Sequence, residues 1–110
     1  MAQVGVNLFF AVLLWVPVLA VAQATDYTLV IKDHKFLPEQ LRVPAGQKVK
    51  ILIDNQDAAP EEFDSYALNR EKVITARGKG IIFIGPLKPG TYGFTGEFHQ
   101  DTAKGTIIVQ

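Results

Sequence analysis

The chain has 110 residues, with 11 Lys and Arg against 11 Asp and Glu, so its formal net charge is zero. A neutral chain without a basic run is not typical of proteins that bind nucleic acid. The chain has no cysteine, which excludes disulfide bonds, thiolate catalysis and thiolate metal ligands.

The first 24 residues differ in character from the rest. They contain no charged residue and no histidine, and the stretch Leu8–Val21 is almost wholly apolar. Ala22-Gln23-Ala24 follows, which fits the small-x-small pattern of a signal peptidase site. We therefore predict a signal peptide at 1–24 and one exported domain at 25–110. The alternative is an uncleaved membrane anchor, because no Lys or Arg precedes the apolar run.

The exported part predicts strands separated by turns. The expected strands, in chain order, are 27–31, 48–54, 81–84, 91–95 and 106–109. Within 48–54 the apolar residues Val49, Ile51 and Ile53 alternate with polar ones, which is the period of a strand. Gly- and Pro-containing segments at 44–46, 78–80 and 88–90 predict turns. No segment has a sustained helical period, and 69–72 would form one helical turn at most. The expected fold class is all-β, a sandwich or barrel.

Few residues offer metal or proton chemistry. The chain has two histidines, His34 and His99. Glu97, His99 and Asp101 alternate and would share one side of an extended segment, and carboxylates with imidazole suit copper(II), zinc or iron. The other interpretation is a polar loop with a solvated histidine. Glu61 and Glu62 are adjacent acids, so in a strand at most one of them faces a shared site. The default interpretation of such a pair is two solvated surface acids.

Three strings of sequence resemble cupredoxin domains. Residues 36–49, FLPEQLRVPAGQKV, resemble the opening Phe-x-Pro, short strand and Pro-Ala-Gly turn, with a following strand that ends at Asn55. Residues 87–94, LKPGTYGF, resemble the cupredoxin "PGxYxF" strand, and 104–109 the closing strand. The resemblance covers essentially all of 25–110, and it implies a cupredoxin-like Greek-key β-sandwich of about seven strands.

The ligand positions of this family are mostly changed. Blue-copper members carry His, Cys, His and usually Met. At the matching positions this chain has Glu61, Gly96, His99 and, approximately, Thr102. Without a thiolate there is no Cu–S bond, so a type 1 blue-copper electron carrier is excluded.

Three further strings, EEFDS at 61–65, LNREKV at 68–73 and GEFH at 96–99, resemble the cupredoxin domains of bacterial iron-uptake systems. These include the N-terminal domain of EfeO-type proteins and small periplasmic cupredoxins that accompany Ftr-type ferrous-iron permeases. The resemblance implies a periplasmic protein that binds a copper ion, an iron ion or both, works with a membrane iron permease and oxidises Fe(II). It also places the loop of His34 at the metal end of the sandwich. The expected metal ligands are His99, Glu97, Glu61 and His34. The alternative is a metal-free interaction module that docks a membrane transporter.

Overall fold

The structure is a computed structural model of the whole chain, and it describes Gly5, residues 11–15 and residues 26–110. Most of the predicted signal peptide, and its cleavage site, lie outside the described residues. Residues 11–15 are exposed and belong to no helix or strand. Among the residues described, no helix is long and apolar enough to cross a membrane.

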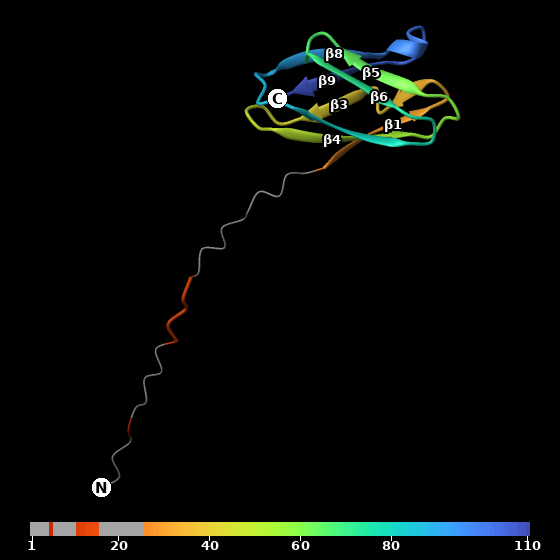
Figure 1. Cartoon of the computed structure of the whole chain (residues 1–110). Coiled ribbons are helices and arrows are strands. Elements are labelled where there is room, and N and C mark those ends of the chain that lie inside the picture. Colours follow the sequence, from red (N-terminus) through yellow and green to blue (C-terminus); the bar gives the residue numbers. More distant parts are fainter. Residues whose placement is uncertain (1–4, 6–10, 16–25) are drawn as a thin grey trace.

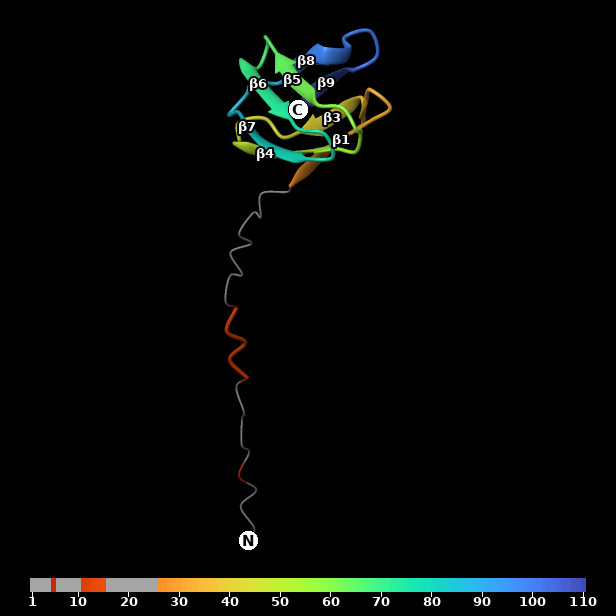
Figure 2. The same cartoon turned by 45° about the vertical axis from the view of Figure 1, so that its right-hand side comes forward.

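Two sheets pack face to face in the described part of the chain, as Figures 1 and 2 show. The four-stranded sheet has the order β2-β1-β4-β7 and the five-stranded sheet the order β3-β9-β8-β5-β6. The strands are β1 Tyr27–Lys32, β2 Lys35–Leu37, β3 Gln40–Val43, β4 Val49–Asn55, β5 Glu61–Ser65, β6 Arg70–Ile74, β7 Lys79–Ile84, β8 Gly90–Gly96 and β9 Lys104–Val109. A 3-10 turn, η1 Glu97–His99, follows β8.

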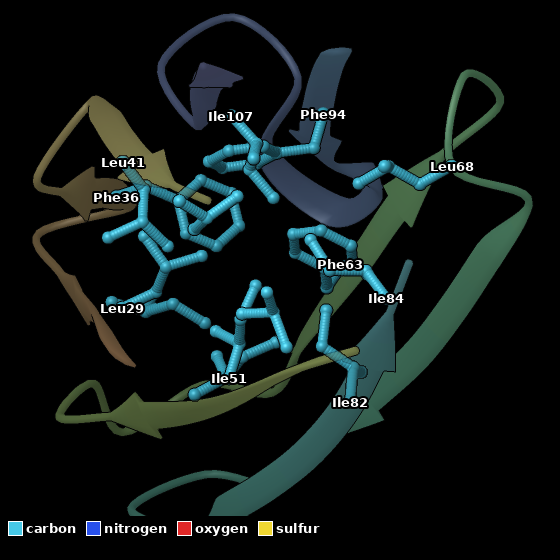
Figure 3. Packing of buried hydrophobic residues seen from close by; sticks show 14 of the residues in the cluster. Leu29, Phe36, Leu41, Ile51, Phe63, Leu68, Ile82, Ile84, Phe94 and Ile107 are labelled. Carbon is cyan, nitrogen blue, oxygen red and sulfur yellow. The ribbon is translucent and has the colours of Figure 1, made fainter. Parts of the chain in front are cut away.

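The core lies between the two sheets and is built by alternation along the strands. Val49, Ile51 and Ile53 are buried as predicted, because every second residue of β4 faces the other sheet. Three phenylalanines meet in the core, Phe36 from the four-stranded sheet and Phe63 and Phe94 from the five-stranded sheet. The ring of Phe94 lies 4.9 Å from that of Phe36 and 5.0 Å from that of Phe63. Figure 3 shows these phenylalanines packed with aliphatic side chains of the core, among them Leu29, Ile51 and Ile82 of the four-stranded sheet.

The all-β prediction is confirmed, with nine strands in the described residues in place of about seven. The additional strands are short or polar. β5 carries Glu61 and β6 is exposed at four of its five positions, so neither has the apolar pattern by which strands are recognised in a sequence. Residues 69–72, for which one helical turn at most was predicted, form none, because Arg70–Ile74 pairs with β5 as an edge strand.

Strand directions bring four segments to one end of the sandwich. β1 runs parallel to β4, so the turn after Lys32 and the loop after Asn55 begin at the same end of the sheet. β8 runs antiparallel to β5, with Gly96 opposite Phe63, so the end of β8 lies beside the start of β5. The β1–β2 turn, the β4–β5 loop, the first residue of β5 and η1 therefore meet there. We call this end the site end.

Candidate metal site

Three side chains converge at the site end: His34 from the β1–β2 turn, Glu61 from the first position of β5, and His99 from η1. One possible ligand atom from each lies within 4.8 Å of the others. The imidazole rings of His34 and His99 lie against one another, tilted by 33°, with centroids 3.7 Å apart. The His34 side chain is 45% exposed and that of His99 27%, whereas Glu61 is 2% exposed. The site is thus a buried carboxylate under two accessible imidazoles.

Glu61 is held by three polar contacts although its strand position faces the core. Its Oε1 accepts hydrogen bonds from the backbone N–H of Glu62 at 3.0 Å and of Phe98 at 2.9 Å. Its Oε2 lies 2.5 Å from Nδ1 of His99. A buried carboxylate needs such partners, because its desolvation is costly without them. The expectation that both adjacent acids are solvated is wrong for Glu61, while Glu62 points outward on the other side of the strand.

Gly96 makes room for the Glu61 carboxylate. A Cβ at this position would lie 2.6 Å from Cδ of Glu61 and 2.6 Å from Cβ of Ala103. Both distances are far below van der Waals contact, so no side chain fits while Glu61 is in place. Two of the three positions at which this chain departs from the blue-copper pattern, Glu61 and Gly96, are therefore in direct contact. The carboxylate takes the space into which a side chain at position 96 would project.

His34 is positioned by a tightly held left-handed turn. Asp33 and His34 have φ angles of 52° and 56°, which are unfavourable for residues with a Cβ. Asp57 stabilises this turn from the β4–β5 loop, since its Oδ1 accepts the N–H of Asp33 at 2.8 Å and its Oδ2 the N–H of His34 at 3.0 Å. From the other side, the hydroxyl of Thr102 donates to the His34 carbonyl at 2.6 Å.

Asp57 is itself fixed and remains charged. Its own N–H donates to Oδ1 of Asn55 at 3.0 Å. Partial burial would raise the pKa of Asp57, but the N–H donors of His34 and Asp33 and the charges of His34 and Arg77 together hold that pKa below its ordinary value. Sequence reasoning missed Asp57 and Thr102 as supports of His34, because neither is near it in the chain.

We expect Asp57→Asn to weaken metal binding through His34. The two oxygens of Asp57 accept the backbone N–H groups of Asp33 and His34. Asparagine has one acceptor oxygen and an NH₂ group in place of the other, so one of these two N–H groups loses its acceptor. The dissociation constant for Cu(II), measured by calorimetric titration, should rise about tenfold or more. Asp54→Asn, which removes the same charge from an outward position of β4, is the control. In a His34→Ala background Asp57→Asn should have no further effect; an equal loss in both backgrounds would mean that Asp57 does not act through His34.

Glu97 lies next to the three converging side chains and is not one of them. It is exposed at the start of η1 and borders, with His34, His99 and Thr102, a shallow pocket of about 540 Å³. The expected alternation of Glu97, His99 and Asp101 along an extended segment is wrong, because 97–99 form a 3-10 turn. Asp101 also borders the pocket.

The outward face of β5 adds negative charge close to this pocket. Burial and the nearby carboxylates of Glu71, Asp64, Glu97 and Glu61 raise the pKa of Glu62. Glu62 is thus surrounded by other acids. One of these acids, Glu97, also borders the pocket. The site end therefore combines two imidazoles with a strongly acidic border.

Comparisons with known proteins agree with this architecture. The family model described as the cupredoxin-like domain matches residues 6–109. The chain belongs to the cupredoxin-like domain family. An uncharacterized protein of Rickettsia prowazekii is 46% identical over 84 residues, which are 76% of this chain and 67% of that protein.

Solved structures share the cupredoxin-like fold. Amicyanin from Paracoccus versutus superposes with a TM-score of 0.62 at 17% identity, over 79% of this chain and 83% of amicyanin. The metal-binding domain of a Cu(I)-exporting P-type ATPase from Streptococcus pneumoniae, solved with Cu(I), superposes with a TM-score of 0.69 at 14% identity, over 77% of this chain and 84% of that domain. At these identities the likeness concerns the fold alone.

The nitrogen and oxygen ligands of this cupredoxin-like chain fit Cu(II) or Zn(II) better than Cu(I). Nitrogen and oxygen ligands lie about 2.0–2.2 Å from an ion such as zinc, so two of them are at most about 4.4 Å apart. The three candidate atoms lie within 4.8 Å of one another, which is close to this limit. Imidazole and carboxylate suit Cu(II) and Zn(II), whereas Cu(I) prefers sulfur ligands, which are absent from this site.

Proposed function

We propose that this chain is an exported, periplasmic metal-binding protein that holds a divalent ion, Cu(II) foremost, with His34, Glu61 and His99. The observation that carries the proposal is the convergence of two accessible imidazoles on a buried carboxylate that the backbone holds in place. Three protein ligands leave a position open toward the pocket, as in metal sites that exchange a ligand or react.

Glu61 has two ways to serve such an ion. With Nε2 of His99 as the ligand, Oε2 of Glu61 accepts a hydrogen bond from the Nδ1–H group of His99, which sets the tautomer and makes the imidazole more basic. With Oε2 as a ligand, the Glu61–His99 pair opens, because 2.5 Å is shorter than the separation of two ligands on one ion. In both cases the charge of Glu61 offsets that of the cation.

The test is a titration of residues 25–110 with Cu(II), followed by calorimetry and absorption spectroscopy. We expect binding of about one equivalent without an intense blue band, since no thiolate is present. His99→Ala should abolish this binding, and Glu97→Gln should weaken it less, because Glu97 borders the pocket without joining the three ligands. A wild-type chain that binds neither Cu(II) nor Zn(II) would contradict the proposal and favour a metal-free docking module.

For the biological role we propose ferrous-iron uptake beside a membrane iron permease, with Fe(II) as the substrate. Support comes from the resemblance to the iron-uptake cupredoxins and from the acidic border of the pocket, where Glu97 and Asp101 offer oxygen ligands that favour Fe(III) over Fe(II). Bound copper(II) would supply a one-electron acceptor. Fe(II) oxidation is therefore measured with and without Cu(II), and the expected copper-dependent rate should disappear in His99→Ala. Copper binding without any such rate would leave a metal carrier and remove the ferroxidase role.

A further inference from the structure

The outward face of the four-stranded sheet is unusual for a sandwich. An outer sheet face is normally polar, because the alternate residues face water. Here it carries Val30, Leu37, Leu52, Ile81 and Phe83, each at a position that alternates with buried residues. Leu37 is 48% exposed, Ile81 43% and Phe83 46%. Solvent-facing apolar side chains therefore occur on all four strands of this sheet.

Strand pairing brings these side chains together. Val30 of β1 lies opposite Leu37 of β2, and Leu52 of β4 lies opposite Ile81 of β7. Phe83 is the next residue after Ile81 on the same side of β7. Across the β1–β4 pair, Val30 is a diagonal neighbour of Leu52, because Leu52 lies opposite Thr28. Such direct and diagonal neighbours are in reach of one another, so the residues form a band across the sheet.

The same face is basic although the chain as a whole is neutral. It carries Lys32, Lys35, Lys50 and Lys79, and its one acid is Asp54. Lys32 lies directly opposite Lys35, an arrangement that destabilises a sheet unless an anion is near. In the described part of the chain, the ion pairs within 4.0 Å are both between a histidine and a carboxylate, so none of these lysines is in such a pair. Lys79 lies opposite Asp54, which leaves the other three lysines without an acid opposite them on this face.

We propose that this face docks on an anionic lipid surface. Lysines interleaved with exposed apolar side chains match the headgroup boundary of such a membrane, where the ammonium groups meet phosphates and the apolar groups enter the acyl region. A second copy is disfavoured, since two basic faces repel. An acidic protein is less favoured, because exposed apolar side chains lie between the lysines, and such side chains match the acyl region of a membrane.

Docking in this way also orients the metal site. His34 lies in the turn between Lys32 and Lys35, so the site end borders the docked face and its pocket opens beside the membrane. The inference goes beyond the proposed function and stands without it, because it concerns residues that bind no metal.

The experiment uses residues 25–110, which contain every described strand and the whole core, without added metal. Cosedimentation is compared for vesicles of phosphatidylcholine alone and with phosphatidylglycerol. We expect binding to the anionic vesicles, lost on adding salt. The variant Lys32→Gln/Lys35→Gln/Lys50→Gln/Lys79→Gln should lose about fivefold in affinity for each lysine. The matched control Arg42→Gln/Lys72→Gln/Lys88→Gln/Lys104→Gln, which removes the same charge elsewhere, should bind nearly as the wild type does.

A second variant separates lipid from an acidic protein. Ile81→Ser/Phe83→Ser should weaken vesicle binding while leaving binding to soluble polyglutamate unchanged, because only the membrane takes up apolar side chains. The proposal is overturned if the wild type ignores anionic vesicles or if both lysine variants lose equally. It is also overturned if polyglutamate binds as tightly as the vesicles and Ile81→Ser/Phe83→Ser does not weaken vesicle binding, or if sedimentation shows a dimer through this face.

Discussion

Glu61→Gln is expected to lower the affinity for Cu(II) about 10- to 100-fold while the sandwich remains folded. The amide keeps an oxygen for the N–H groups of Glu62 and Phe98, so the local backbone retains its partners. Its NH₂ group would face Nδ1 of His99 and donate to it. The proton of the neutral imidazole then moves to Nε2, which can no longer bind a metal. A direct ligand role of Glu61 leads to the same loss, since an amide oxygen carries no charge.

Calorimetric titration measures the affinity, and a nitrogen-15 NMR spectrum of the His99 ring shows its tautomer. Glu62→Gln is the control, because it removes the same charge from the adjacent residue that faces outward. Glu61→Ala separates binding from folding: it leaves two backbone N–H groups without their acceptor and should cost about 2–4 kcal/mol of unfolding free energy. Unchanged affinity in Glu61→Gln would show that this carboxylate neither binds the metal nor orients His99.

Gly96→Ala is expected to destabilise the protein by about 1–3 kcal/mol and to disturb the metal site. The added methyl would lie 2.6 Å from Cδ of Glu61 and from Cβ of Ala103, and the backbone of Gly96, with φ −91° and ψ 109°, is acceptable for alanine. The cost is therefore steric. For the same reason Gly96→Cys should not produce a blue-copper centre while Glu61 remains.

Urea unfolding of Gly96→Ala, Glu61→Ala and the double variant gives the coupling between the two positions. We expect the double variant to be more stable than the sum of the single losses predicts, because removing the carboxylate frees part of the space for the methyl group. Gly93→Ala in the same strand, where a Cβ has nothing within 4 Å, is the control. Additive losses would mean that Glu61 and Gly96 do not compete for space.

The fold followed largely from patterns in the sequence. Alternation in 48–54 and the Gly/Pro turns predicted an all-β sandwich, since burial of every second residue leaves a local signature. The strands beginning at Glu61 and Arg70 had no such signature. The first buries a carboxylate and the second is an exposed edge, so their place in the sheet depends on pairing with other segments and not on their own residues.

The site divides in the same way. The types of ligand available, two histidines with carboxylates and no cysteine, are properties of composition, and they exclude blue-copper chemistry without any coordinates. The selection among those carboxylates came from the folded chain. Glu61 faces inward because of its strand register, Glu97 stays outside on a 3-10 turn, and Asp57 shapes the His34 turn from a distant loop. Such choices depend on register and on contacts between segments far apart in the chain, which local sequence patterns do not encode.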